Sequence, residues 1–519
     1  MSATSDSPSK TAKLIDRAGV LPMPPSRARL VASIFSFSVM CVFLLIAGVF
    51  AHAIRAIVEP DIWWHLRNAR YLLQHHSFPS VDTYSFGAAG SPWLNHEWLS
   101  EIPFFLGFKS MGLQGILTVY FVILVLIYIG VYYRACRAGA DCKNATVVTF
   151  LAILMGIVSI GPRMLLFGWL CMVGMLIVLD RFRQTGKGLW LLPPLFALWI
   201  NLHGSWVFGM VVLIITIASG LVESEWGLVV ARRWPPVELK KLLIVFAASL
   251  AALFVNPFGY RLLLYPFDLL FRQPSNMKYI EEWQSVNFST GHGKLALIMI
   301  FSLLAAALFS RRRWRLDEVV LVAFALSGAL SHRRLLFFAG LILAPILAPH
   351  VKQFPFFDRE RDKPWLNAAI MAAVVGSLVF FFPSAAQLQQ KVAEQFPTAA
   401  LNFMERQNLR GRIFNSRMWG GYMEWNTPEL KPFIDGRSDI FVYNGTFDEH
   451  VKALLIEEPF EILDKYKFDY VLMEPKQPLS YVVEHSPAWR LIYSDKVAVL
   501  FERIPATLAP VTPSKAQPN

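Results

Sequence analysis

Long apolar runs alternate with short polar breaks along the first 383 residues. The main runs cover residues 30–57, 104–133, 242–255, 295–309, 319–330 and 366–382. Apolar runs of about 18 or more residues are typical of helices that cross a bilayer, and the shorter runs are delimited by polar flanks. The pattern predicts many transmembrane helices over residues 30–383. The first run is too long for a signal-peptide core and precedes no cleavage site, so we interpret it as an anchored first helix.

After Pro383 the pattern changes, and strand-like segments alternate with helical ones. This order predicts a small α/β domain over residues 384–505. The predicted strands lie at 412–415, 432–434, 470–473, 491–493 and 497–501, and the predicted helices at 398–407 and 447–457. The stretches Trp419–Tyr422 and Ile434–Arg437 are interpreted as turn-rich loops, either tight turns or contacts above a membrane cavity. The proline-rich residues 506–519 are predicted to be disordered.

The composition agrees with a membrane protein, since 55% of the residues are hydrophobic, 17% are charged and the mean hydropathy is +0.44. Soluble domains carry about a quarter charged residues. The formal net charge of +12 would suit nucleic acid, but the basic excess lies entirely before residue 384, with 34 basic and 20 acidic residues. There the basic residues cluster in alternate loops, which is a topology signal. No nucleic-acid partner is expected.

The basic clusters predict an orientation, because positively charged loops stay in the cytoplasm. Six regions hold 23 of the 34 basic residues, namely 10–29, 134–143, 181–187, 232–241, 311–315 and 352–363. Keeping all six inside requires about eleven transmembrane helices, a cytoplasmic tail at residues 1–29, a first outer loop at about 58–103 and an extracytoplasmic C-terminal domain. The later outer breaks are 161–163, 201–206, 256–293 and 331–334.

The first outer loop contains acids and histidines in two compact groups. Asp61 and His65 lie near its start, and His96 and Glu97 lie near its end. In a helix that starts near Asp61, Asp61 and His65 share one face, and Asp61 also suits the N-cap position. Two carboxylates in one loop directly after a membrane helix are a candidate acid/base pair. The alternative is interfacial anchoring by the neighbouring tryptophans, which leaves the acids and histidines unexplained.

Later outer breaks add further candidate binding residues. Arg163 in a short turn either holds an anion such as phosphate or extends to the interface. His203 faces either a polar cavity or a neighbouring helix. The adjacent acids Glu281 and Glu282 could serve a metal ion or a sugar hydroxyl, or could be solvated surface.

The last outer break contains Arg333 and Arg334, which oppose the charge trend of the outer loops. Binding of an anionic lipid headgroup or a pyrophosphate would explain them. Together, the five breaks predict a polar cavity at the outer interface, ringed by cationic groups. The natural ligand of such a cavity is a polyprenyl-phosphate derivative.

These features resemble the C-type glycosyltransferase superfamily (GT-C), polytopic enzymes that use sugars linked to polyprenyl phosphate. Its members have an acid at the start of the first large outer loop and usually a second acid later in that loop, which Asp61 and Glu97 match. Largely uncharacterised bacterial members contain stretches similar to Asp61–His65, Asn95–Trp98, Asn201–Gly204 and Glu282-Trp283. The doubled acid of several branches is replaced by Asp61-Ile62, and the Glu-Lys-Pro-Pro segment of the aminoarabinose branch is absent.

The resemblance implies a glycosyltransferase of the bacterial inner membrane that acts at the extracytoplasmic face. Asp61 would deprotonate the acceptor, and Glu97 would orient the acceptor or hold a divalent cation, the one candidate cofactor. The donor phosphate would be bound by Arg163, Arg333 and Arg334. The rest of the polar lining would be formed by His65, His96 and His203. The partners would be a polyprenyl-phosphate-linked sugar, a lipid, glycan or protein acceptor, and membrane lipid.

Three other functions remain open. A polysaccharide ligase or a phosphoryl-group transferase on a lipid carrier would depend on the arginines and histidines more than on Asp61. A transporter would be expected to show internal repeats and broken helices, neither of which is seen in the sequence. A non-catalytic assembly scaffold would bind polymer at the same loops without turnover.

Overall fold

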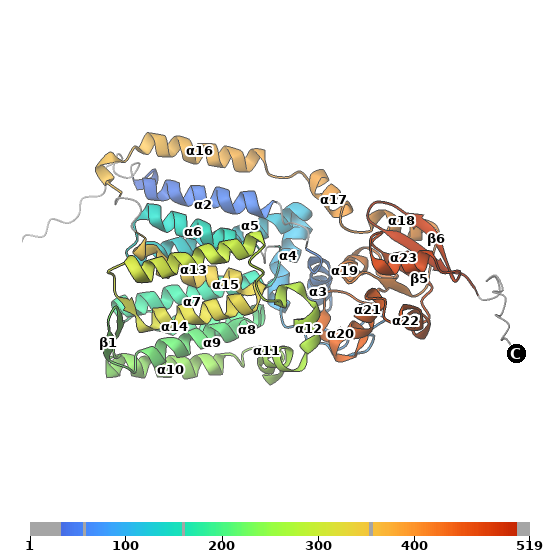
Figure 1. The fold of residues 1–519 in the computed structure, drawn as a ribbon, viewed down its shortest axis with the longest axis horizontal. Coiled ribbons are helices and arrows are strands. Elements are labelled where there is room, and N and C mark those ends of the chain that lie inside the picture. Colours follow the sequence, from blue (N-terminus) through green and yellow to red (C-terminus); the bar gives the residue numbers. More distant parts are fainter. Residues whose placement is uncertain (1–32, 55–58, 158–160, 352–356, 506–519) are drawn as a thin grey trace, which may run out of the picture.

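A computed structural model describes residues 33–54, 59–157, 161–351 and 357–505 (Figure 1). The predicted cytoplasmic tail at 1–29 and the predicted disordered tail at 506–519 lie outside the described residues. The α-helices of the first part are α2 (Phe37–Ala53), α3 (Ile62–His75), α4 (Trp98–Met111), α5 (Leu113–Arg137), α6 (Cys142–Gly156), α7 (Leu165–Thr185), α8 (Leu192–Leu202), α9 (Trp206–Ser219), α10 (Pro236–Ala252), α11 (Tyr260–Arg272), α12 (Pro274–Tyr279), α13 (Gly291–Phe309), α14 (Leu316–Ser331), α15 (Leu336–Leu347) and α16 (Pro364–Phe380). The C-terminal part adds α17 (Ala385–Ala393), α18 (Thr398–Arg406), α19 (Arg417–Asn426), α20 (Ser438–Tyr443), α21 (Thr446–Leu454), α22 (Pro459–Lys465) and α23 (Pro478–Glu484).

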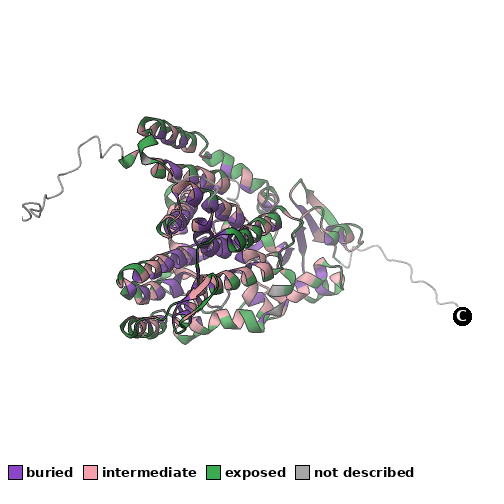
Figure 2. Cartoon of the chain, turned by 60° about the vertical axis from the view of Figure 1, so that its left-hand side comes forward, coloured by how far each residue is buried: buried purple, intermediate pink, exposed green. Residues whose placement is uncertain are grey.

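The apolar helices form a bundle whose interior residues are buried and whose peripheral residues are more exposed (Figure 2). Many of the exposed residues are large and apolar. All twelve residues of α15 are buried, as expected for a helix that is apolar on every side. Phe309 at the end of α13 is 83% exposed, and Phe380 at the end of α16 is 81% exposed. Exposed apolar surface of this kind suits a lipid environment.

Four described helical segments are long and apolar enough to cross a bilayer, namely Leu113–Arg137, Leu165–Thr185, Gly291–Phe309 and Arg333–His350. The bent pair α16 and α17 would make a fifth. Four further apolar helices are shorter, namely Phe37–Ala53, Cys142–Gly156, Leu189–Leu202 and Trp206–Ser219. The chain is therefore mostly helical with four or five candidate transmembrane helices, and the count of eleven stays a prediction.

The apolar run at 104–133 contains two helices instead of one. α4 ends at Met111, α5 begins at Leu113, and Gly112 between them has a φ of +60°, which favours glycine. The two helices pack backbone to backbone, since a Cβ on Gly115 would lie 1.8 Å from the carbonyl oxygen of Gly107. The predicted end of the first outer loop at about residue 103 therefore lies inside α4, the first helix of this hairpin.

The C-terminal domain contains a sheet of β4 (Ile413–Asn415), β5 (Tyr470–Met473), β7 (Val499–Arg503) and β6 (Trp489–Ser494), in that spatial order. β4 and β5 are parallel, and the other two pairs are antiparallel. The predicted small sheet is thus confirmed. Residues 432–434 were predicted to be a strand. Pro432 does pair with Ile413 of β4 in a single parallel bridge, but the stretch does not extend into a strand, because the backbone N–H groups of Phe433 and Ile434 donate to the Asn415 side chain.

The stretch Trp419–Tyr422 was also wrongly predicted, since it lies inside α19 and not in a loop. Its two glycines allow close packing. A Cβ on Gly420 would lie 2.1 Å from the carbonyl oxygen of Ile434, and a Cβ on Gly421 would lie 3.1 Å from the Trp64 ring. α19 therefore packs against the start of α3.

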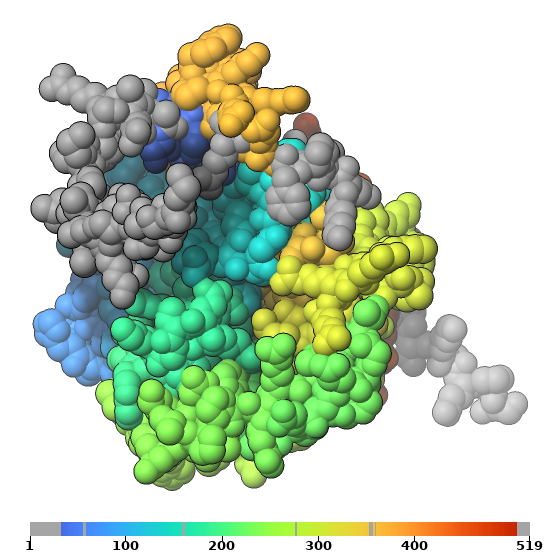
Figure 3. Space-filling model, turned by 90° about the vertical axis from the view of Figure 1, so that its left-hand side faces the viewer, coloured from blue at the N-terminus to red at the C-terminus, as the bar shows by residue number. Residues whose placement is uncertain are grey.

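A second sheet, which the sequence pattern did not predict, lies at the end of the bundle away from the C-terminal domain (Figure 1). It consists of β1 (Ser224–Trp226), β2 (Val229–Ala231) and β3 (Trp314–Arg315). Figure 3 views this end, with α16 at the top and α10 at the bottom. The C-terminal domain covers the opposite end, where the helices α3, α4, α11 and α12 also gather (Figure 1).

A buried charge cluster around Arg437 joins the C-terminal domain to the first loop. The Arg437 guanidinium pairs with Asp82 of the first loop at 2.8 Å. It also pairs with Asp435 at 2.6 Å and with Glu424 at 3.1 Å. Asp435 and Arg437 thus stabilise a turn, as one interpretation of the sequence expected, and Arg437 also reaches the first loop.

Candidate functional site

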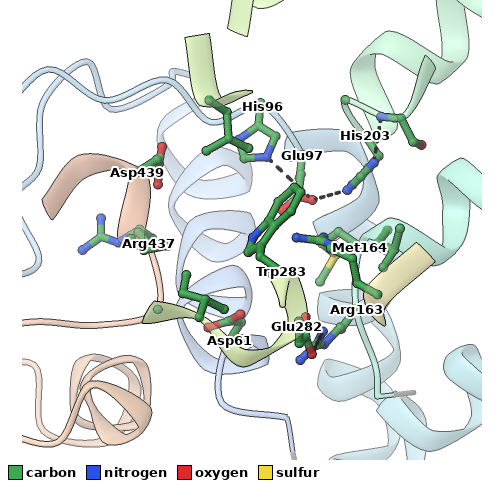
Figure 4. A pocket seen from close by; sticks show the side chains of 18 of the residues that line it. Asp61, His96, Glu97, Arg163, Met164, His203, Glu282, Trp283, Arg437 and Asp439 are labelled. Atoms are coloured by element: carbon green, nitrogen blue, oxygen red, sulfur yellow. Dashed lines mark hydrogen bonds and ion pairs between the residues drawn. The ribbon is translucent and has the colours of Figure 1, made fainter. Parts of the chain in front are cut away.

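One cavity of about 680 Å³ lies where the C-terminal domain meets the helical bundle (Figure 4). It is lined by all ten residues selected from the sequence, namely Asp61, His65, His96, Glu97, Arg163, His203, Glu281, Glu282, Arg333 and Arg334. These residues come from five separate breaks in the apolar pattern. The fold therefore brings together side chains that are up to 273 positions apart, while their roles remain predictions.

Asp61 stands at the N-cap position of α3 but makes no side-chain capping hydrogen bond. Its carboxylate instead lies against the backbone of Gly436 in the C-terminal domain, where a Cβ would lie 1.7 Å from Asp61 Oδ1. Burial raises the pKa of Asp61, and the charges of Arg163 and Arg417 partly offset this effect. A buried carboxylate with a raised pKa holds a proton more strongly, so Asp61 is suited to act as a base.

Glu97 faces three imidazole rings. Its carboxylate oxygens lie 3.2 Å from His203 Nε2, 3.6 Å from His65 Nε2 and 3.7 Å from His96 Nε2. Figure 4 shows His96 and His203 pointing at Glu97 from two sides. His65 belongs to α3, His96 and Glu97 to the end of the first loop, and His203 to the C-cap of α8.

The protonation of this group follows from its burial and contacts. Burial and the charge of Asp61 raise the pKa of Glu97 to about 8. Burial lowers the pKa of His96 to about 3 and the pKa of His203 well below its usual value. His203 Nδ1 accepts the Ser205 backbone N–H at 2.9 Å, so the proton of the neutral ring is on Nε2, which points at Glu97. At neutral pH, Glu97 is therefore protonated among neutral histidines.

Glu101 holds His65 in place, and the sequence analysis missed it. Its buried carboxyl group contacts His65 Nδ1 at 2.8 Å and accepts hydrogen bonds from the side-chain amides of Asn95 at 2.8 Å and Asn68 at 3.3 Å. The signal that could have revealed it is its spacing, since Glu101 follows Glu97 by one helical turn. Carboxyl, imidazole and carboxyl groups thus form a line from Glu101 through His65 to Glu97.

Arg163 is already paired with two carboxylates. Its Nε lies 2.8 Å from Glu59 Oε2, and its Nη1 lies 2.5 Å from Glu282 Oε1. Arg333 pairs with Glu281 at 2.5 Å, and the Glu281 side chain is mostly exposed at the cavity rim. An anion that approaches Arg163 or Arg333 would have to compete with these acids.

Arg334 and Arg417 also line the cavity and are further candidates for binding an anion. The Arg334 guanidinium lies 4.4 Å from the centre of the Trp283 ring, within the range of a cation–π contact. Arg417 begins α19, lines the cavity from the C-terminal domain and contacts Met418 Sδ at 3.8 Å. No pattern in the sequence singled out Arg417, because charged residues are common in a soluble domain and nothing distinguishes this one.

Asp439 also comes from the C-terminal domain. The Tyr265 hydroxyl donates to Asp439 Oδ2 at 3.0 Å, and the Tyr265 ring stacks on His96 with 4.1 Å between ring centres. Burial raises the pKa of Asp439 to about 6, although the Tyr265 hydrogen bond opposes this shift. The C-terminal domain therefore contributes Arg417, Gly436 and Asp439 to the cavity.

Part of the cavity lining is apolar. Side chains at the start of α7, on α9 and on η5 (Arg333–Leu335) form this part, called the apolar wall here, namely Met164, Leu165, Trp169, Val207, Phe208 and Leu335. A cavity with both charged and apolar lining suits an amphiphilic ligand.

Among residues 33–54, 59–157, 161–351 and 357–505, no group of three or more His, Cys, Asp and Glu side chains is arranged to hold a metal ion. Glu97 in particular faces the Nε2 proton of His203 and two further imidazoles. Mg²⁺ and Ca²⁺ prefer several oxygen ligands. The residues around Glu97 therefore do not supply the several oxygen ligands that Mg²⁺ or Ca²⁺ would need.

No protein-family model and no curated protein sequence matches this chain. Its function has therefore to be inferred from the cavity itself. The observations that bear on it are the buried carboxyl groups, the arginines and the apolar wall.

Proposed function

We propose that this chain is a polytopic membrane glycosyltransferase, resembling GT-C enzymes, that moves a sugar from a polyprenyl-phosphate donor to an acceptor at the extracytoplasmic face. In this proposal eleven helices cross the membrane, namely α2, α5, α6, α7, α8, α9, α10, α13, α14, α15 and α16. The predicted basic loops then lie in the cytoplasm, and the cavity and the C-terminal domain lie outside. The membrane is a bacterial inner membrane in this account.

The observation that carries the proposal is the mixed lining of the cavity. A polyprenyl-phosphate sugar has a polar, anionic head and a long apolar tail. The cavity combines buried acids and arginines with the apolar wall that includes Leu165, Trp169 and Phe208. A volume of about 680 Å³ lies within the range of ligand pockets. These features support a lipid-linked head group as the ligand.

Asp61 is the proposed general base. It takes the proton from an acceptor hydroxyl or amine while the acceptor oxygen or nitrogen attacks C1 of the sugar. The bond between C1 and the phosphate oxygen breaks, and polyprenyl phosphate leaves with the electron pair. The raised pKa of Asp61 supports this role, because a base is most effective when its pKa approaches the working pH.

Arg334 and Arg417 are the proposed stabilisers of the leaving phosphate. Fixed positive charge aimed at developing negative charge is often the largest contribution to catalysis. Arg163 and Arg333, the other predicted phosphate ligands, pair with Glu59, Glu282 and Glu281, and in this proposal they also set the charge balance of the cavity lining.

The test is a cell-surface glycan comparison between a deletion strain that carries the wild-type gene and one that carries Asp61→Asn, at matched protein levels. The proposal predicts that Asp61→Asn loses the same glycan as the deletion strain. Asp358→Asn is the matched control, because this half-exposed acid forms an ion pair only with Arg361 in the part of the chain described and does not line the cavity. An unchanged glycan in Asp61→Asn would reject Asp61 as the base and would favour a phosphoryl-group transferase or a scaffold.

A further inference from the structure

Helix α11 has an apolar stripe that is largely exposed, although Phe267 within it also packs edge-on against Trp206 of α9, with 6.4 Å between ring centres. Tyr260, Leu264, Phe267 and Phe271 recur every three or four positions, and each is between 42% and 76% exposed. This spacing places the four side chains on one face of the helix. An exposed face of four large apolar residues, two of them phenylalanines, marks a contact surface.

The other face of α11 is part of the cavity. Tyr265, Pro266 and Leu269 line it from this helix. The C-terminal domain holds the polar edge of α11, because Asp439 accepts the Tyr265 hydroxyl and the Tyr443 hydroxyl donates to Asp268 at 2.9 Å. α11 is therefore a wall between the cavity and whatever lies against its stripe.

The surroundings of α11 indicate what lies there. α11 follows α10, whose C-terminal end continues into the exposed apolar residues Phe254 and Val255. Figure 1 shows α11 at the junction between the bundle and the C-terminal domain, the level at which a bilayer surface would end in the proposed topology. The exposed Arg261 and Arg272 stand near the two ends of the helix, where they can reach lipid phosphates.

We propose that α11 is an interfacial helix whose Tyr260–Phe271 stripe lies in the outer leaflet, against phospholipid. Leu270 lines the cavity and is also about half exposed, so the cavity opens beside the stripe. If the proposed function holds, the apolar tail of the donor leaves the cavity at Leu270 and runs into the bilayer along α11. The contact of the stripe with lipid does not depend on the identity of the donor.

The experiment measures which medium surrounds the stripe. Phe267→Cys and Phe271→Cys, in a chain with the four native cysteines replaced, are labelled with a small fluorophore. The protein is reconstituted in nanodiscs of phosphatidylcholine and phosphatidylglycerol. Fluorescence quenching by brominated acyl chains is compared with quenching by aqueous iodide. Phe301→Cys on α13 is the lipid reference and Tyr481→Cys on α23 is the water reference, since both side chains are exposed to a similar extent.

We expect brominated lipid to quench the labels at positions 267 and 271 as strongly as the label at 301, and several-fold more than the label at 481. Strong iodide quenching at 267 and 271, equal to that at 481, would overturn the inference. If the cysteine-free chain does not fold, a photo-crosslinking amino acid in place of Phe271 in the native chain gives the same information through crosslinks to phospholipid. An Asp61-dependent glycan without lipid contact at α11 would reject only this inference, and lipid contact without such a glycan would reject only the proposed function.

Discussion

Asp61 and Glu97 are two carboxyl groups of one cavity with different surroundings. Asp61 is flanked by the charges of Arg163 and Arg417, whereas Glu97 faces neutral imidazoles. The two groups therefore lose their protons at different pH values, and Glu97, with a pKa of about 8, keeps its proton at neutral pH. Groups with separated pKa values are suited to separate acid and base roles. In this account, Asp61 takes a proton, and Glu97 donates a hydrogen bond to the acceptor, to His65 or to His96, because the Nε2 atom of His203 already carries a proton.

Glu97 is expected to carry its proton at neutral pH. The infrared carbonyl band of a carboxylic acid should disappear with a midpoint near pH 8 in the wild type, and this component should be missing in Glu97→Gln. The pKa of Glu97 is about 8 in the folded protein, whereas the ordinary value, expected in the unfolded chain, is 4.5. The stability that the bound proton contributes is therefore complete below pH 4.5 and is lost as the pH rises toward about 8. The exposed Glu429→Gln should retain the band. Loss of the band near pH 4.5 in the wild type would contradict the assignment.

Gly436→Ala should reduce the glycan product at least about tenfold, which corresponds to roughly 1.4 kcal/mol. The added methyl group would occupy the position of Asp61 Oδ1, so either the Asp61 carboxylate or the backbone around Gly436 has to move. Gly376→Ala on α16 is the control, because a Cβ there meets no atom within 4 Å. The measurement is the glycan level at matched protein level, and equal activity of the two variants would show that the close approach is unimportant.

At the scale of elements, the polar side chains of the site are positioned by the hairpin of α4 and α5 and by the start of α3. Glu101 on α4 contacts His65 on α3. His203 at the C-terminal end of α8 contacts Glu97. α19 packs on α3 through Gly421. The site is thus assembled by the ends of helices, where side chains leave the apolar interior.

Glu101→Leu should lower the free energy of unfolding by about 3 kcal/mol, because it leaves His65 Nδ1 and the Asn95 amide buried without their partner. Glu101→Gln keeps the size and one acceptor and should cost less. Thermal unfolding in nanodiscs measures both variants, with the exposed Glu405→Leu on α18 as the control. An unfolding midpoint of Glu101→Leu equal to that of the control would contradict this structural role.

The sequence predicted several elements for physical reasons that can be named. The apolar helices and the sheet of the C-terminal domain follow from the pattern of apolar positions, which depends on local burial. The stretch 432–434 and Trp419–Tyr422 were misassigned, because a side chain from Asn415 and packing against Trp64 decide their conformation. Such contacts between distant segments leave no local pattern.

For the site, the pattern of polar breaks selected residues that do line one cavity. It could not supply Arg417 or Asp439, because a soluble domain contains many charged residues and only the docking of this domain selects these two. Nor could the sequence indicate that Arg163 is bound by Glu59 and Glu282, since pairing depends on side-chain geometry.

At the scale of the whole molecule, the C-terminal domain closes the cavity and is held by Arg437. Arg437→Met would leave Asp82 and Asp435 buried without their cation, which typically costs about 3–5 kcal/mol. We expect limited proteolysis to release the C-terminal domain of this variant much faster than that of the wild type. Arg490→Met, which breaks an exposed pair with Glu502, should behave like the wild type. Equal cleavage rates for the two variants would contradict the proposal that Arg437 holds the C-terminal domain against the first loop.

The central claim is that a polyprenyl-phosphate sugar is consumed at Asp61. The most direct measurement is the amount of polyprenyl-phosphate-linked sugars extracted from membranes of a deletion strain that expresses either the wild type or Asp61→Asn at equal level. The account predicts that one such lipid accumulates in the Asp61→Asn strain and returns to a low level with the wild type. Identical lipid-linked sugar pools in the two strains, together with a glycan defect in the deletion strain, would contradict it.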